Sequence, residues 1–299
     1  MTQQAIQLLS RSCTVTVGTV QIKNIGQQQG LDVWFAVRRS LRAKEPNTCD
    51  LRLYNLSDAS RKAIAASSSP SPSPASGPGA PSAVVPVKIE AGYVGGTSTI
   101  FLGEMRSAQT MTDGPNTVTE ITTGDGDLAA ILARSTASFG PGANAYVVAK
   151  RLLADMGLGS GNVESFAQVL RSSPLFNGGA TLKGNSMARL IDLARSCALE
   201  VSLQNGVPQF VALGQPLGGQ AYKLSSDSGL IGSPNVDTKG VLTCETLLLP
   251  GMNPGIPIEV DAKYVQGLYR VISVETTGDT SGNDWRHSIE ARRYGTGLG

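Results

Sequence analysis

The sequence repeats a short β-strand pattern at two places about half a chain length apart. Residues 48–53 read Thr-Cys-Asp-Leu-Arg-Leu and residues 243–248 read Thr-Cys-Glu-Thr-Leu-Leu, and alternating segments led by proline occupy residues 86–91 and 257–262. This order predicts a duplicated β-barrel; because any two amphipathic strands share some pattern, chance similarity is the alternative. Two similar barrels in one chain allow a ring in which each subunit fills two positions, which is more typical of assembly proteins than of enzymes.

Composition narrows the class of protein further. A chain of 299 residues can hold two or three domains, and its 35 glycines and 16 prolines favour β-rich structure with many turns. The net charge is only +2 and 16% of the residues are charged, so the chain has no basic stripe of the kind that grips phosphate backbones. Composition therefore argues against nucleic-acid binding through bulk charge.

The four cysteines are far apart in the sequence and form no Cys-x-x-Cys pair. This spacing argues against a zinc site and a dense disulfide framework, so we expect four small buried hydrophobic side chains. They are Cys13, Cys49, Cys197 and Cys244. The first residues also lack the layout of a signal peptide, and no apolar run reaches the roughly 18 residues that a membrane span needs. We expect a protein made and assembled in a reducing cytoplasm, without membrane insertion.

Hydrophobic periodicity predicts a mainly β chain with an α/β middle domain and two tube-like antiparallel β-barrel domains. The predicted domains are residues 1–135, 136–215 and 216–299. Helical patterns cover residues 57–64, 128–133, 143–156 and 186–198, and Asn205-Gly206 predicts a hairpin turn. In the last of these helices, Leu190, Ile191 and Ala194 should be buried. Trp285 and Ile289 should anchor the last strand of the second barrel.

Residues 65–82 form a Ser/Pro-rich insert within the first domain, with no charge and no large apolar side chain. Such a composition cannot offset the entropy of ordering the segment. We interpret it as a tolerated surface insertion, and a polyproline recognition arm is the alternative.

No segment of the sequence carries a complete motif for catalysis or for binding a metal or cofactor. Asp125-Gly126-Asp127 resembles part of a calcium loop but lacks the later ligands, so we interpret it as helix capping. The glycines of residues 157–161 follow a helix rather than a strand, which argues against dinucleotide binding. His287, the only histidine, shares an apolar strand face and should be a packed or interface residue. We therefore expect no catalytic, cofactor-binding or metal-binding residue.

Several short phrases, taken in order, resemble one family. They are DLRLYNLS at 50–57, VKIEAGY at 87–93, IFLGE at 100–104, TGDG at 123–126, GLIGSP at 229–234, LLLP at 247–250 and YRVISV at 269–274. Together they resemble the baseplate hub proteins of contractile phage tails. The Ser/Pro-rich insert departs from this pattern, and Glu275 stands where an aromatic residue or histidine is usual.

This resemblance implies a homotrimeric ring at the tip of the tail tube, in the baseplate of the virion. Two barrels per subunit would give a pseudo-sixfold collar that adapts the sixfold tube to a threefold spike. The implied partners are the tail tube or a tube-initiator protein, the central spike protein and baseplate wedge proteins, and DNA would pass through a channel without specific binding. The competing classes are a cell-wall polysaccharide hydrolase on a β scaffold and a carbohydrate-binding module.

Overall fold

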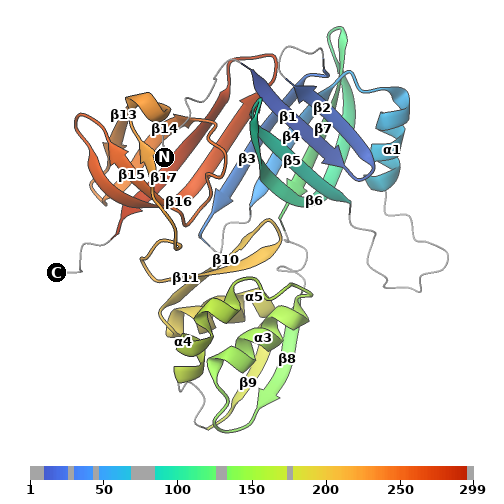
Figure 1. Ribbon diagram of the computed structural model, residues 1–299. Coiled ribbons are helices and arrows are strands. Elements are labelled where there is room, and N and C mark those ends of the chain that lie inside the picture. The colour runs from blue at the N-terminus through green and yellow to red at the C-terminus, as the bar shows by residue number, and fades with distance from the viewer. Residues whose placement is uncertain are drawn as a thin grey trace.

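A computed structural model describes six stretches of the chain: residues 10–25, 30–42, 47–68, 85–125, 133–173 and 178–294. Within these residues the dominant element is one sheet of 13 strands, which holds strands from both the first and the last part of the chain. Its main path runs β13-β14-β17-β16-β3-β4-β7-β6-β5-β1-β2, and β15 joins β12 to β16 beside it. Figure 1 shows this sheet above a smaller α/β unit.

The first part of the chain supplies seven strands and one helix of the described structure. They are β1 (Arg11–Val17), β2 (Val20–Ile25), β3 (Val33–Ser40), β4 (Thr48–Tyr54), α1 (Asp58–Ser68), β5 (Pro86–Tyr93), β6 (Gly96–Asp113) and β7 (Asn116–Gly124). As the sequence predicts, α1 begins after Ser57, whose hydroxyl accepts from the backbone N–H of Ser60 at 3.2 Å. The helix runs into the first residues of the Ser/Pro-rich insert, and the remainder of that insert lies outside the described residues.

The last part of the chain supplies a second set of strands. They are β12 (Tyr222–Leu224), β13 (Leu230–Val236), β14 (Val241–Leu247), β15 (Pro257–Asp261), β16 (Gln266–Asp279) and β17 (Trp285–Arg293), with a short 3-10 helix at Ser226–Ser228. The neighbours in this set follow the order β13-β14-β17-β16-β15-β12, and those in the first set follow β3-β4-β7-β6-β5-β1. The two sets therefore share one strand order. They differ in the direction of the last pair, because β5 and β1 are antiparallel whereas β15 and β12 are parallel.

Both long strands carry an irregularity at the same place. The pairing of β6 with β7 shifts between Met105 and Ser107, and the pairing of β16 with β17 shifts between Val271 and Ser273. A bulge adds a residue to one strand only, so a shared bulge fixes how the two copies align. The prediction of a duplicated β unit is thus confirmed in strand order and in this shared irregularity.

The proline-led strands align in register. Pro86 of β5 lies opposite Glu104, the residue just before the bulge segment of β6. Pro257 of β15 lies opposite Arg270, which holds the same place in β16. The predicted match of residues 86–91 with residues 257–262 is therefore confirmed.

The predicted match of the two Thr-Cys strands is wrong by two residues. Just past the bulge, Asp50 of β4 lies opposite Thr122 of β7. At the equivalent position of the second copy, also just past the bulge, Thr243 of β14 lies opposite Glu290 of β17. Asp50 is therefore the counterpart of Thr243, and not of Glu245 as the motif suggests. A shift of two residues keeps every side chain on its own face, so alternation alone cannot detect it.

The β-rich class is confirmed, but the described strand pairs form an open path and not two closed barrels. The two copies are joined edge to edge by β3 and β16, which pair antiparallel from Ser40 opposite Ser273 to Trp34 opposite Asp279. Each copy therefore uses one of its strand edges to pair with the other copy. In Figure 1 each copy appears as a curled part of one continuous sheet.

The join between the copies is packed around Phe35, which is fully buried. Trp285, at the start of β17, meets the Phe35 ring edge-on with centroids 5.7 Å apart, and its indole N–H donates to the Gly92 carbonyl at 3.2 Å. Gly278 lies directly opposite Phe35, and a Cβ at Gly278 would overlap the ring. Trp285 therefore packs into the core of the first copy, contrary to the predicted role in the second, whereas Ile289 is buried in the second core as predicted.

The middle of the chain forms a separate small α/β unit. Its elements are β8 (Arg134–Phe139), α3 (Ala145–Asp155), a 3-10 turn (Val163–Phe166), α4 (Ala167–Ser172), β9 (Ala180–Asn185), α5 (Ser186–Ser196), β10 (Leu199–Gln204) and β11 (Val207–Ala212). The predicted helices 143–156 and 186–198 correspond to α3 and α5, which are capped by Asn144 and Asn185. The predicted helix 128–133 lies almost wholly outside the described residues. The antiparallel pair of β8 with β9 was not predicted.

The apolar face of α5 was predicted correctly in part. Leu190 and Ala194 are 0% and 1% exposed, and Ile191 is only partly buried at the edge of the same cluster. We expect Leu190→Ala to lower the free energy of unfolding by about 2–5 kcal/mol, because it leaves a cavity in a packed core. Ile191→Ala is the matched control and should cost clearly less in urea denaturation. Equal losses for both variants would contradict the described packing of α5.

Candidate functional site: a polar sheet face and a buried junction

Alternate residues of the large sheet project from one face, which is polar across both copies. We call this set the polar face: Trp34, Arg38, Asp50, Arg52, Glu120, Thr122, Glu245, Ser273, Glu275, Thr277, Arg286, Ser288 and Glu290. Strand registers place these residues in continuous rows through β7, β4, β3, β16, β17 and β14, because directly opposite residues share a face. The rows cross the β3–β16 join, so the polar face belongs to the chain as a whole.

Each arginine of the polar face is paired with a carboxylate on a neighbouring strand. These pairs are Arg38–Glu275 at 2.9 Å, Arg52–Glu120 at 2.8 Å and Arg286–Glu245 at 3.6 Å. All six side chains remain between 38% and 62% exposed, so each pair adds little to stability. Together these pairs make a solvent-exposed surface that carries no continuous stripe of positive charge. Glu275, the departure from the family pattern, thus has a local partner in Arg38.

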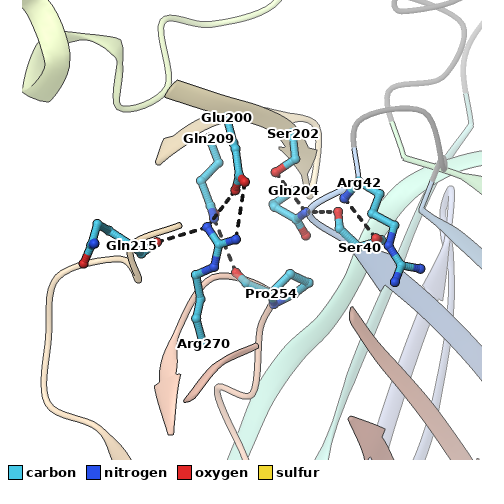
Figure 2. A network of polar contacts seen from close by, with 9 residues as sticks. All are labelled: Ser40, Arg42, Glu200, Ser202, Gln204, Gln209, Gln215, Pro254 and Arg270. Carbon is cyan, nitrogen blue, oxygen red and sulfur yellow. Dashed lines mark hydrogen bonds and ion pairs between the residues drawn. The ribbon is translucent and has the colours of Figure 1, made fainter. Parts of the chain in front are cut away.

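The large sheet also makes a buried junction with the middle unit, shown in Figure 2. The Arg270 guanidinium of β16 donates two hydrogen bonds to the Glu200 carboxylate of β10, from Nη1 to Oε2 at 2.7 Å and from Nη2 to Oε1 at 3.3 Å. Its Nη1 atom also donates to the Gln215 carbonyl at 3.1 Å. The Arg270 side chain is only 7% exposed. Two-pronged arginine–carboxylate pairs fix orientation as well as distance. A small apolar cluster of Leu41, Val211 and Ile272 packs at the same junction.

A second anchor holds the tip of the β10–β11 hairpin. The Asp125 carboxylate, just after β7, accepts from the backbone N–H groups of Asn205, at 2.6 Å, and Gly206. It also accepts from the Asn47 amide at 2.9 Å, and the Gln204 amide donates to the Ser40 carbonyl at 2.9 Å. The interpretation of Asp125 as a helix cap is therefore wrong, because its oxygens cap a hairpin turn of the middle unit. Asp127 lies outside the described residues.

Burial shifts the pKa values of two charged side chains, Asp125 and Arg39. Burial raises the pKa of Asp125 above its usual value, against the effect of its hydrogen bonds. Burial also lowers the pKa of Arg39 to about 10, and Arg39 donates to the Met252 carbonyl at 2.7 Å and to the Asn253 side chain. The Arg39 Nε atom has no hydrogen-bond partner within the described structure. These groups hold loops against the sheet.

His287 is a packed residue, as the sequence predicts. Its Nε2 atom donates to the Leu249 carbonyl at 3.0 Å, which leaves Nδ1 to accept from the Thr276 hydroxyl at 2.8 Å. The ring is fully buried, and this burial lowers the pKa of His287 to about 4. Both ring nitrogens are thus engaged by the fold and the ring is neutral at pH 7.

The four cysteines are free and buried, as predicted. Burial raises the pKa of Cys13 and of Cys244 to about 12, so neither thiol is a reactive nucleophile at pH 7. No group of three or more His, Cys, Asp or Glu side chains within the described residues could hold a metal ion. In the same part of the chain, no helix is long and apolar enough to cross a membrane.

The sequence model of a family described as "Baseplate hub gp41" matches residues 12–264. The chain belongs to this baseplate hub family. The resemblance drawn from short phrases is thereby confirmed at the level of a phage baseplate hub. Such hub proteins are structural components of the phage tail and of the virion. A sequence comparison with curated proteins gives no match for this hub protein.

Solved structures share the fold of this hub protein at very low sequence identity. A tail protein from Neisseria meningitidis MC58 has a TM-score of 0.62 at 9% identity, covering 95% of this chain and 97% of its own. The 43 kDa tail protein of prophage MuSo2 from Shewanella oneidensis has a TM-score of 0.61 at 10% identity, covering 95% and 98%. The E. coli c3393 protein, a component of the type VI secretion system, has a TM-score of 0.57 at 11% identity, covering 94% and 77%.

The junction was not predicted, although two of its parts were visible in the sequence. The sequence shows both the Asn205-Gly206 turn and Asp125, but nothing local links residues that lie 80 positions apart. Arg270 and Glu200 likewise carry no motif.

We expect Asp125→Ala to destabilise the hub protein by about 1–3 kcal/mol, because three buried or part-buried donors lose this acceptor. Asp50→Ala, on the polar face, is the control and should change the unfolding free energy by less than about 0.5 kcal/mol. Urea denaturation measures both. An Asp125→Ala variant as stable as the parent would show that the hairpin tip is not held by this carboxylate.

The neutral, buried His287 should make stability depend on pH. Its pKa falls from 6.5 in the unfolded chain to about 4 in the folded protein, so only the unfolded chain takes up a proton between these values. This contribution is complete above about pH 6.5 and is lost as the pH falls, to a total of about 3 kcal/mol. His287→Gln, which keeps a donor for Leu249, should lose less stability than the parent between pH 7 and pH 5. Identical pH profiles of unfolding would contradict this assignment.

Proposed function

We propose that three copies of this chain form a ring at the tip of a contractile tail tube. In this ring each copy fills two of six nearly equivalent positions, and the ring adapts the sixfold tube to a threefold central spike. The observation that supports this proposal most directly is the duplication within one chain, with one strand order and one bulge position in both copies. A chain with two equivalent units has a direct use where three subunits meet six.

The two sheet copies, in residues 1–135 and 216–299, would form the collar, and the middle domain, residues 136–215, would project from it. The separate apolar core of the middle unit supports this division, as does its attachment through a mainly polar junction. A projecting unit offers a surface to the other proposed partners, namely the tail tube or a tube-initiator protein, the spike protein and the baseplate wedge proteins. Assembly would take place in the host cytoplasm.

We propose that the polar face lines the channel through which the genome passes. Its arginines are matched by carboxylates on neighbouring strands, as in Arg38–Glu275 and Arg52–Glu120. A wall with a surplus of positive charge would hold a phosphate backbone, because affinity for DNA rises with each phosphate that is neutralised. A solvated wall without a surplus of positive charge lets DNA pass without specific binding.

Light scattering coupled to size-exclusion chromatography tests the ring proposal. We expect a particle with the mass of three chains, and electron microscopy of that particle should show threefold symmetry around an open channel. Within each chain, the two sheet copies should be related by a rotation of about 60° around the ring axis, because six similar positions share one turn. A particle of another stoichiometry, or two copies without that common axis, would overturn the proposal.

A further inference from the structure

Besides the outer edges of β2 and β12, two strand edges of the large sheet lie open in the described structure. One is the outer edge of β13, which pairs with β14 alone. The other is the edge of β6 from Ser107 to Asp113, because β5 covers β6 only as far as Glu104. Open edges expose unpaired backbone N–H and C=O groups, and natural proteins rarely leave a long one without a use or a guard.

The counterparts of these two edges are paired with each other inside the chain. Ser273, just past the bulge of β16, corresponds to Ser107 of β6, so residues 273–279 of β16 correspond to residues 107–113 of β6. β13 corresponds to β3, since each lies beside the matching strand β14 or β4. Residues 273–279 of β16 pair antiparallel with β3. The chain therefore makes one contact of this kind within itself and leaves the equivalent surfaces of a second one open.

Burial follows the same division. In β16 the residues from Ser273 onward alternate between buried and half-buried, whereas those of β6 from Gln109 to Asp113 are all exposed. In β3 only Arg38 is exposed, whereas most of β13 is. Apolar side chains lie on the open strands: Met111, Ile231 and Val236 are 43%, 38% and 39% exposed. Covering both edges would reduce this exposure, because Thr277 and Val37, the counterparts of Met111 and Val236, are half-buried and buried.

We infer that β13 of one copy pairs antiparallel with residues 107–113 of β6 in the next copy. This contact rests on the proposed function, and it names the surfaces through which the ring closes. It is head-to-tail, because one copy offers β13 and its neighbour offers β6, and a contact of this kind generates a closed ring when its rotation divides a full turn. Each new join would continue the sheet, and with it the polar face, from copy to copy.

The internal join supplies the register. Ala36 of β3 lies opposite Asp50, and Asn235 of β13 lies opposite Thr243, the counterpart of Asp50. Ala36 and Asn235 are therefore equivalent. Thr277 pairs with Ala36 and corresponds to Met111, so Met111 of one copy should lie opposite Asn235 of the next.

The contact between copies should be shorter than the internal one. β13 ends in a tight turn, in which Asp237 accepts from the backbone N–H of Lys239 at 2.8 Å. At its other end the register is interrupted around Gly232, whose φ is +65°, and Pro234, which has no N–H to donate. These features restrict the regular ladder to the neighbourhood of Asn235 and guard the free edge against indiscriminate pairing.

Cysteine cross-linking tests the inferred pairing. Residues directly opposite in an antiparallel pair have Cα atoms about 5 Å apart, within reach of a disulfide. The double variant Met111→Cys and Asn235→Cys should give, on mild oxidation, a covalent trimer in denaturing gels that reducing agent dissolves. The natural cysteines are buried and should not interfere. The controls are the two single variants, which should each stay monomeric in the gel and give cross-linked dimers only when mixed.

Each outcome separates the pairing from the ring. Trimers seen by light scattering that never cross-link in the double variant would overturn the edge pairing and leave the ring proposal intact. Dimers formed by either single variant alone would also overturn it, because they would require a contact between identical strands. A chain that stays monomeric and uncross-linked at every accessible concentration would overturn both. Equal thermal midpoints of the reduced variants and the parent would exclude misfolding as the cause.

Discussion

The pairing of β3 with β16 is the contact on which the rest of the structure depends. It joins two copies of one strand order into a single sheet, carries the polar face across the boundary and places Trp285 against Phe35. It also determines which edges remain open. A contact between residues as far apart as Trp34 and Asp279 forms only after a long loop has closed, so it depends on the whole chain rather than on any local segment.

Sequence patterns predicted the parts of the fold that local geometry dictates. The proline-led strands and the helices α3 and α5 follow from periods of two and of about 3.6 residues and from capping side chains. The Thr-Cys match failed by two residues because a period of two gives the same faces in either register. The prediction of two closed barrels was wrong because no local sequence pattern indicates that β3 pairs with β16. For Trp285, the face could be predicted but not the core into which it packs.

The junction with the middle unit illustrates the same limit for polar groups. Arg270 and Glu200, and Asp125 with the hairpin tip, are pairs brought together only by the folded chain. Buried groups of this kind need their partners in place, since an unmatched charge behind the sheet would cost more than the pair contributes. The attachment of the middle unit is therefore specific in direction. The two-pronged Arg270–Glu200 pair fixes orientation as well as distance, which the apolar contacts of Leu41, Val211 and Ile272 alone would not do.

The glycine opposite Phe35 has a consequence for the route by which such a molecule is completed. Gly278 leaves room for the ring, but its counterpart on β6 is Thr112, whose side chain would occupy that room. A β3 strand that approached the β6 edge of a neighbouring chain would meet this obstruction, so β3 fits the β16 edge and not the equivalent edge of β6. The glycine thus determines which strand edge can accept β3. The β3–β16 join is therefore favoured over a join of β3 with β6, and the β6 edge stays free for a different strand.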